Sequence, residues 1–238
     1  TIASGTWKNV LRMKVVYFLI FCALVLVASA INYDVLSMGL HKELMIDVAL
    51  VLNSIAALLV VISLTFEIPK ELREGVASTL LAKPLGRFQY LLGKMIGCVV
   101  TGAVICFLIA IGSFIVFNIS FAQRIDVTMF QSHLLIILAL IPMSALGVLF
   151  AVLLPEVIAP IITVVVVWFA FSTKFLSNIW GLYGGILPDL DLFNFKANAV
   201  YQVSIPWMYI LLVAVWGICY AAFALSLASI IFERKDIK

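Results

Sequence analysis

The stretch EIPKELREGVASTLLAKPLGRFQYLLGK, residues 67–94, decides the fold of this chain. It holds eight charged residues, in a sequence that has 15 basic and 12 acidic residues altogether. Long apolar stretches flank it on both sides. Because a charge costs about 2.5–3.5 kcal/mol at the centre of a bilayer, we expect this stretch, called the hairpin below, to lie outside the lipid between two membrane spans.

The composition of the whole chain is typical of a membrane protein. It is 65% hydrophobic and 11% charged, with a mean hydropathy of +1.24, whereas a soluble domain carries roughly 25% charged residues. We therefore predict one all-α polytopic membrane domain over residues 1–238, with membrane lipid around it and no nucleic-acid partner. Four cysteines fall in apolar segments and are expected to act as small buried hydrophobic residues: Cys22, Cys98, Cys106 and Cys219.

Six transmembrane helices are predicted, because spans of about 20 residues fit the apolar segments. They cover roughly 15–31, 45–66, 91–117, 132–154, 157–171 and 206–232. Residues 5–14 are predicted to form an N-terminal interfacial helix, with a basic flank that only orients the first span as the alternative. Residues 172–205 form an outer segment rich in apolar side chains, which we expect to contain short re-entrant helices between spans five and six.

Lysine and arginine are distributed unevenly between the two sides of this arrangement. With six spans, the N-terminus, the hairpin, the turn at 154–156 and the C-terminus share one side. That side carries 11 of the basic residues, against 4 on the other. The positive-inside rule places the basic side in the cytoplasm, so both termini and the hairpin are predicted to face the cytosol from an inner or plasma membrane.

Within the hairpin, Pro69 is predicted to open a new helix at its first turn. This helix should end at Lys83-Pro84, because a residue before proline disfavours helical backbone. An apolar face recurs at four-residue spacing, at Ile68, Leu72, Val76 and Leu80. A basic and aromatic boundary is expected where the third span enters the lipid, at Arg87, Phe88 and Tyr90. Such an amphipathic helix can dock in a groove on a soluble partner; the alternative is an ordinary solvated loop.

Three segments resemble the membrane subunits of type-2 ATP-binding-cassette (ABC) exporters. The hairpin is similar to the signature hairpin of these permeases. The similarity lies in Glu71-x-x-x-Gly75, then Leu80-Leu81-Ala82-Lys83-Pro84-x-x-Arg87, then Leu92-Gly93-Lys94. The segments LPDLDLFN at 187–194 and FERKD at 232–236 stand where these permeases carry similar ones. The resemblance implies a dimer with a second permease copy or paralogue, two cytosolic ATPase subunits, and a hairpin that forms the coupling helix. The coupling residues would then be Glu71, Arg73, Glu74, Gly75, Lys83, Pro84, Arg87 and Lys94.

The chemistry of ATP hydrolysis is absent from the sequence. No GxxxxGK[ST] phosphate-binding loop is present, so we expect no cofactor in this chain, and ATP and Mg²⁺ in a partner subunit. His41 and His133 are predicted to stand isolated at loop ends, so no metal site is expected. Asp189 and Asp191 could hold a cation, but helix capping is the favoured interpretation.

The predicted spans contain almost no ionisable groups. Asp47 and Lys94 lie near span ends, where a charged head can reach the interface. Carriers coupled to protons or ions usually have charges along their pathway. The pattern therefore argues against a secondary transporter and favours a membrane protein whose energy source lies outside the membrane. The polar residues are expected to bond between helices, with a translocation path as the alternative: Asn53, Ser54, Ser63, Thr101, Ser113 and Ser144. Small residues are predicted to allow close helix packing at Gly93, Gly97, Gly217, Ala221, Ala224 and Ala228.

The sequence therefore predicts a non-catalytic permease subunit of an ATP-driven exporter. The alternative is a non-transporting scaffold or receptor whose hairpin recruits a soluble protein. An intramembrane enzyme would need paired catalytic groups at one depth, and the sequence offers none. The residues do not specify the transported substrate.

Overall fold

The computed structural model describes residues 40–75, 86–121, 126–173 and 188–234, together with the isolated positions 21, 25–27 and 29. This part of the chain contains helices and no strand. Four of the helices are long and apolar enough to cross a membrane, by length and composition. They are α4 (His41–Arg73), α6 (Arg87–Phe121), α7 (Val127–Leu153) and α11 (Trp207–Glu233). The chain is therefore a helical protein with the character of a multi-pass membrane protein.

A shorter apolar helix, α8 (Ile158–Ala170), follows α7. Its 13 residues extend about 20 Å at 1.5 Å per residue, less than the ~30 Å hydrocarbon core of a bilayer. The predicted first span and the predicted interfacial helix fall almost entirely outside the described residues. The structure thus shows four candidate spans, and the arrangement with six stays a prediction.

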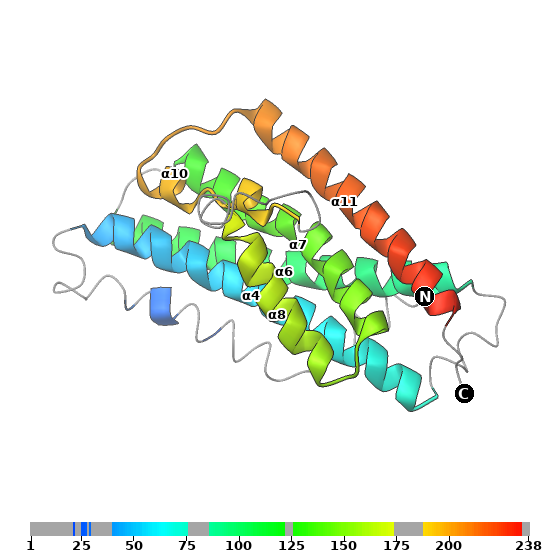
Figure 1. Ribbon diagram of the computed structural model, residues 1–238. Coiled ribbons are helices and arrows are strands. Elements are labelled where there is room, and N and C mark those ends of the chain that lie inside the picture. Colours follow the sequence, from blue (N-terminus) through cyan, green and yellow to red (C-terminus); the bar gives the residue numbers. More distant parts are fainter. Residues whose placement is uncertain are drawn as a thin grey trace.

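Helix α7 lies at the centre of the bundle and contacts α4, α6, α8 and α11 (Figure 1). The most apolar stretch of α7 is 72% buried inside the bundle, whereas the corresponding stretch of α11 is 33% buried. Glycines permit the close approach of its neighbours: a Cβ on Gly147 would lie 3.0 Å from a methyl carbon of Val61 on α4. A Cβ on Gly102 of α6 would lie 2.8 Å from a methyl carbon of Leu140 on α7.

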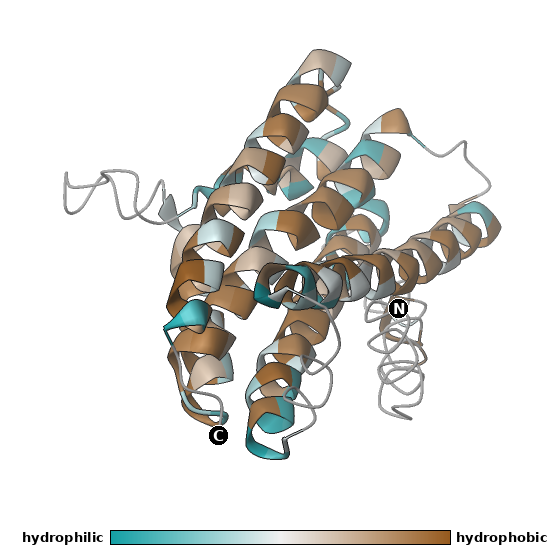
Figure 2. Cartoon of the chain, turned by 90° about the vertical axis from the view of Figure 1, so that its right-hand side faces the viewer, coloured by the Kyte–Doolittle hydropathy of each residue, from teal (hydrophilic) through white to brown (hydrophobic). Residues whose placement is uncertain are grey.

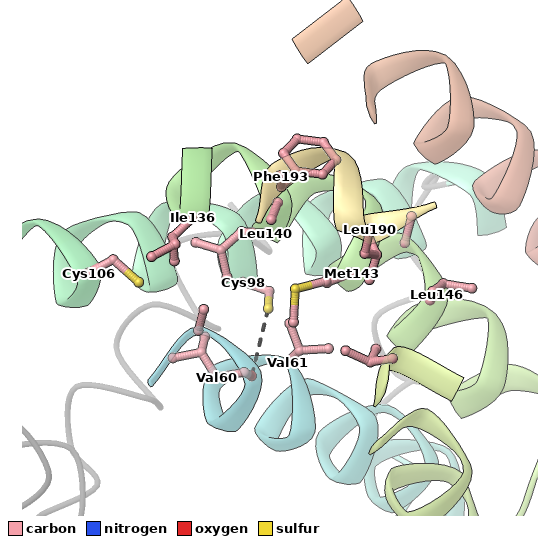
Figure 3. Packing of buried hydrophobic residues seen from close by; sticks show 14 of the residues in the cluster. Val60, Val61, Cys98, Cys106, Ile136, Leu140, Met143, Leu146, Leu190 and Phe193 are labelled. Atoms are coloured by element: carbon pink, nitrogen blue, oxygen red, sulfur yellow. Dashed lines mark hydrogen bonds between the residues drawn. The ribbon is translucent and has the colours of Figure 1, made fainter. Parts of the chain in front are cut away.

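Buried side chains of α4, α6 and α7 fill the space between these helices (Figure 3). Cys98 and Cys106 belong to this core, and the thiol of Cys98 lies 3.7 Å from the carbonyl oxygen of Val60. Both cysteines are the small buried residues that the sequence predicted. For Cys219 that prediction is wrong, since it lies exposed on α11, a helix that buries only one face in the bundle. Cys22 lies outside the described residues.

The described part of the outer segment contains two short helices, η2 (Leu190–Phe193) and α10 (Lys196–Val200). Leu190 and Phe193 are buried, and the Phe193 ring lies 3.2 Å from the position that a Cβ on Gly217 would take. The short helices are thus confirmed for the described residues, and their re-entry into the membrane stays a prediction. Further along α11, the small residues of the predicted stripe are buried as well: Ala221, Ala224 and Ala228. On α6, Gly97 is buried and Gly93 half-buried.

The hairpin does not begin a new helix at Pro69, so that prediction is wrong. Helix α4 continues through Pro69 to Arg73 as one unit of 33 residues. A proline inside a helix removes the backbone hydrogen bond to the residue four positions earlier, here Thr65. The helix persists because side chains on both sides of Pro69 are bonded to α6, as described below.

Hydrophilic residues gather toward the helix ends, while the middle turns are mostly apolar (Figure 2). Large apolar side chains on α11 point away from the bundle, among them Leu211, Leu212, Val215 and Ile218. In a membrane protein such a face is covered by lipid or by another membrane segment.

Candidate coupling site at the hairpin end

The described helix termini on either side of the hairpin form one end of the bundle, called the hairpin end below. Helix α4 ends there at Arg73, and α6 begins there at Arg87. Contacts described below bring the end of α11 and the turn between α7 and α8 to the same place. The opposite end, where α4 begins and α10 lies, is called the far end (Figure 1).

A buried charged cluster joins α4 to α6 at the hairpin end. The Lys94 ammonium lies 2.8 Å from Glu67 Oε1 and 2.6 Å from Glu71 Oε1. The Tyr90 hydroxyl donates a hydrogen bond of 2.7 Å to Glu71 Oε2. Lys94 is 3% exposed and Tyr90 is fully buried. One cation thus stabilises two carboxylates, and a lysine ammonium, with its three donors, can serve both.

The spacing of these residues explains the cluster. Glu67 and Glu71 are four residues apart on α4, and Tyr90 and Lys94 are four apart on α6. Residues at this spacing share a helix face, so two antiparallel helices can present the pairs to each other. The prediction from sequence missed this signal because it placed the hairpin outside the lipid and did not consider pairs between its two flanking helices. The expectations that Lys94 reaches toward the interface and that Tyr90 marks a lipid boundary are wrong, since both are buried.

Arg87, at the start of α6, attaches the end of α11. Its Nη1 donates to the carbonyl oxygens of Phe232 at 2.6 Å and of Glu233 at 3.0 Å. Its guanidinium also lies 5.6 Å from the centre of the Phe232 ring, on which Tyr90 stacks at 6.1 Å. The last carbonyls of a helix lack partners within the helix and carry partial negative charge. A cation at this position therefore stabilises the end of α11.

Arg73 links the end of α4 to the turn after α7. Its Nη1 lies 2.7 Å from Glu156 Oε2. The Arg73 side chain is 68% exposed, and an exposed ion pair contributes less than about 1 kcal/mol to stability. The contact therefore positions the end of α4 beside the turn after α7 and adds little to the stability of the fold. Beside it lies a groove of about 490 Å³ lined by Pro69, Leu72, Arg73 and residues 153–157.

Two further predicted coupling residues end helix α4. Glu74 is exposed, and Gly75 has φ of 73°, a backbone conformation that glycine adopts at helix ends without steric cost. Lys83 and Pro84 lie outside the described residues. The structure therefore brings Glu71 and Lys94 together inside the bundle, holds Arg87 against α11, and leaves Arg73 and Glu74 at the surface.

A second polar network lies between α4, α6 and α7, closer to the far end. The Asn53 amide nitrogen is 2.7 Å from His133 Nδ1, and Ser113 Oγ is 3.3 Å from His133 Nε2. His133 is 2% exposed inside α7, so its predicted place at a loop end is wrong. Because the Asn53 amide nitrogen donates, Nδ1 accepts and the ring proton is on Nε2. The imidazole therefore acts as a neutral link between three helices.

The predicted interhelical bonding of polar residues is confirmed for Asn53 and Ser113. The remaining hydroxyls instead bond to carbonyl oxygens of their own helices: Ser54, Ser63, Thr101 and Ser144. A serine or threonine in a helix can satisfy its hydroxyl within the preceding turn, which removes the need for a partner on another helix.

Asp189 caps η2, as the favoured interpretation of the sequence predicted. Its Oδ1 accepts from the backbone N–H of Asp191 at 3.2 Å and from the Thr173 hydroxyl at 2.6 Å. Among the described residues, no group of three or more His, Cys, Asp or Glu side chains could hold a metal ion.

No protein-family model matches this chain, and no curated protein matches it either. The resemblance to type-2 ABC exporter permeases therefore stays a prediction from the residues quoted above.

Proposed function

We propose that this chain is the membrane-spanning permease subunit of an ATP-driven exporter, with the hairpin as the attachment point of a cytosolic ATPase. The observation that carries the proposal is the set of bonds at the hairpin end. They connect the two helices that bracket residues 76–85 to each other, to the end of α11 and to the turn after α7.

These bonds offer a physical route for movement. A force on residues 76–85 acts on the chain at Gly75 and Gly86, which adjoin α4 and α6. The buried cluster around Lys94 resists sliding of α4 against α6, because separating its charges would leave them buried without partners. Arg87 and Arg73 then extend the connection to α11 and to the turn between α7 and α8. A partner that moved the hairpin would thus move the end of the whole bundle.

The sequence complements this arrangement, because the chain lacks a phosphate-binding loop of its own and its spans hold few charges. Under the proposal, Glu71 and Lys94 position the hairpin from inside the bundle. Glu74, exposed at the end of α4, is available for direct contact with the ATPase. Buried residues and surface residues of the hairpin should therefore respond differently to substitution.

The test is purification of the tagged chain from its native membranes in mild detergent, followed by assay of vanadate-sensitive MgATP hydrolysis in the eluate. The wild-type chain is expected to carry this activity. Glu74→Arg should lose most of it, because the reversed charge lies on the proposed contact surface. Lys42→Gln, which changes a charge at the far end, is the matched control and should keep it.

Two outcomes would contradict the proposal. An eluate without MgATP hydrolysis, from membranes that contain the folded chain, would exclude a stable ATPase partner. A bound soluble protein without hydrolysis would instead favour the scaffold alternative.

A further inference from the structure

A groove of about 560 Å³ opens at the far end of the bundle, between the first turns of α4 and the short helix α10. Its α4 wall includes Glu43 and Asp47, which are four residues apart and share a helix face. Its α10 wall begins with Lys196 and ends at Tyr201. The volume falls within the range of roughly 300–1,000 Å³ that is usual for small-molecule sites.

The three charged groups around this groove have no ion-pair partner in the described part of the chain. Ion pairs there involve Lys42, Arg73 and Lys94, and none includes Lys196, Glu43 or Asp47. Burial lowers the pKa of Lys196, and the charge of Asp47 partly opposes that shift. A half-buried ammonium without a bound anion is poorly solvated, so an anionic group that reached it would be favourable.

Groups of opposite charge stand on opposite walls, and this sets the chemistry of the ligand. Lys196 offers a cation on one wall, while Glu43 and Asp47 offer carboxylates on the other. Tyr201, 77% exposed at the rim, adds an aromatic ring of the kind that binds ammonium groups. A ligand with one charge would meet a like charge in this groove, whereas a ligand that carries both charges would satisfy both walls.

The described residues leave only a small space beneath this groove. Lys196 and Asn194 also border a cavity of about 20 Å³, roughly the space that one water molecule needs. The remaining lining of this cavity is largely apolar and includes Met143, Phe171 and Phe193. Of the two spaces that Lys196 borders, the groove at the far end is therefore the one with room for a small molecule.

We propose that the groove between α4 and α10 binds a zwitterion that joins an ammonium to a phosphate, with the phosphate at Lys196 and the ammonium at Asp47 and Glu43. Such a group occurs as the headgroup of an aminophospholipid and as a free small molecule. The inference needs no ATPase and does not depend on the function proposed above.

The experiment is a binding titration of the purified, detergent-solubilised chain with glycerophosphoethanolamine, by calorimetry. In parallel, native mass spectrometry compares retention of phosphatidylethanolamine with retention of phosphatidylglycerol, which has the phosphate without the ammonium. Lys196→Gln and Asp47→Asn should each weaken binding at least about tenfold, because each removes a charge-assisted contact. Lys196→Arg should keep binding, which separates loss of charge from loss of fold. Lys42→Gln is the control, because Lys42 pairs with Asp126 outside the groove.

Saturable binding of glycerophosphoethanolamine would support the inference with a free zwitterion as ligand. Selective retention of phosphatidylethanolamine alone would support it with a lipid headgroup as ligand. Equal retention of phosphatidylglycerol, absence of binding in both arms, or unchanged binding by Lys196→Gln and Asp47→Asn would each overturn it.

Discussion

Replacing Lys94 with methionine is expected to destabilise the bundle strongly, because the change removes the cation of the buried cluster. Methionine has a similar length, so the apolar stem of the side chain is retained. The carboxylates of Glu67 and Glu71 stay in place, with side chains that are 16% and 15% exposed. They would then face each other as like charges, with the hydroxyl of Tyr90 as a remaining donor to Glu71.

The magnitude follows from the burial of the pair. Breaking a buried ion pair by removing one partner costs about 3–5 kcal/mol, because the charge left behind has lost its solvation. For chains of 150–250 residues, each kcal/mol lowers the melting temperature by about 2–4 °C, so Lys94→Met should lower it by about 6–20 °C. Lys42→Met is the matched control. Its pair with Asp126 is longer, 3.7 Å, and more exposed, so it should cost less than about 1 kcal/mol.

The assay is thermal unfolding of the purified variants in one detergent, followed by circular dichroism. Glu67→Gln and Glu71→Gln should each lower the melting temperature much less than Lys94→Met does, because either change leaves Lys94 with one carboxylate. The triple variant, which combines Lys94→Met with both glutamine substitutions, has no buried charge left in the cluster. It should therefore recover most of the stability that the single lysine substitution loses.

Two results would refute this reasoning. If Lys94→Met unfolded at the wild-type temperature, the cluster would contribute no net stability. If the triple variant were no more stable than Lys94→Met, the loss would come from packing around the methionine and not from unpaired carboxylates.

Three further substitutions test other contacts by the same unfolding assay. Gly147→Ala should lower the free energy of unfolding by about 1–2 kcal/mol, because overpacking against the stiff β-branched neighbours on α4 exceeds the gain in helix propensity. Its control is Gly86→Ala, where no atom lies within 4 Å of the added carbon. Equal effects of the two substitutions would refute the close approach of α7 and α4. Gly75→Ala should cost about 1 kcal/mol because of its left-handed backbone, and an unchanged melting temperature would contradict that conformation. Arg87→Lys should lower the free energy of unfolding by about 1 kcal/mol, because an ammonium reaches the two carbonyl oxygens of α11 less well than a planar guanidinium does. An unchanged melting temperature would mean that the end of α11 does not need the guanidinium.

Much of the architecture could be predicted from the sequence, because lipid and charge exclude each other over the length of a helix. The apolar segments at 157–171 and 206–232 predict α8 and α11 to within about two residues, the usual uncertainty of helix boundaries. Helix α4 extends beyond its predicted end because hydropathy locates where the lipid stops and not where the helix stops. Its last turns are held by Lys94, a residue of the next helix.

The candidate site was only partly predictable for a related reason. The sequence located the charged residues of the hairpin, but it could not say which of them face solvent and which face each other. Glu71 and Lys94 are 23 residues apart, and Arg87 lies 145 residues before Phe232. Contacts over such separations depend on the register of packed helices, which no local pattern fixes.

The sequence by itself determined that this chain is helical, has the character of a multi-pass membrane protein and concentrates charge in the hairpin, since composition and charge spacing act locally. The tertiary structure decided that part of this charge lies inside the bundle, where Lys94 neutralises carboxylates that α4 alone would leave exposed. It also decided that the neutral imidazole of His133 links three helices, and that Gly147 lies against α4. The physical reason is that burial and pairing belong to surfaces that meet only when the helices pack.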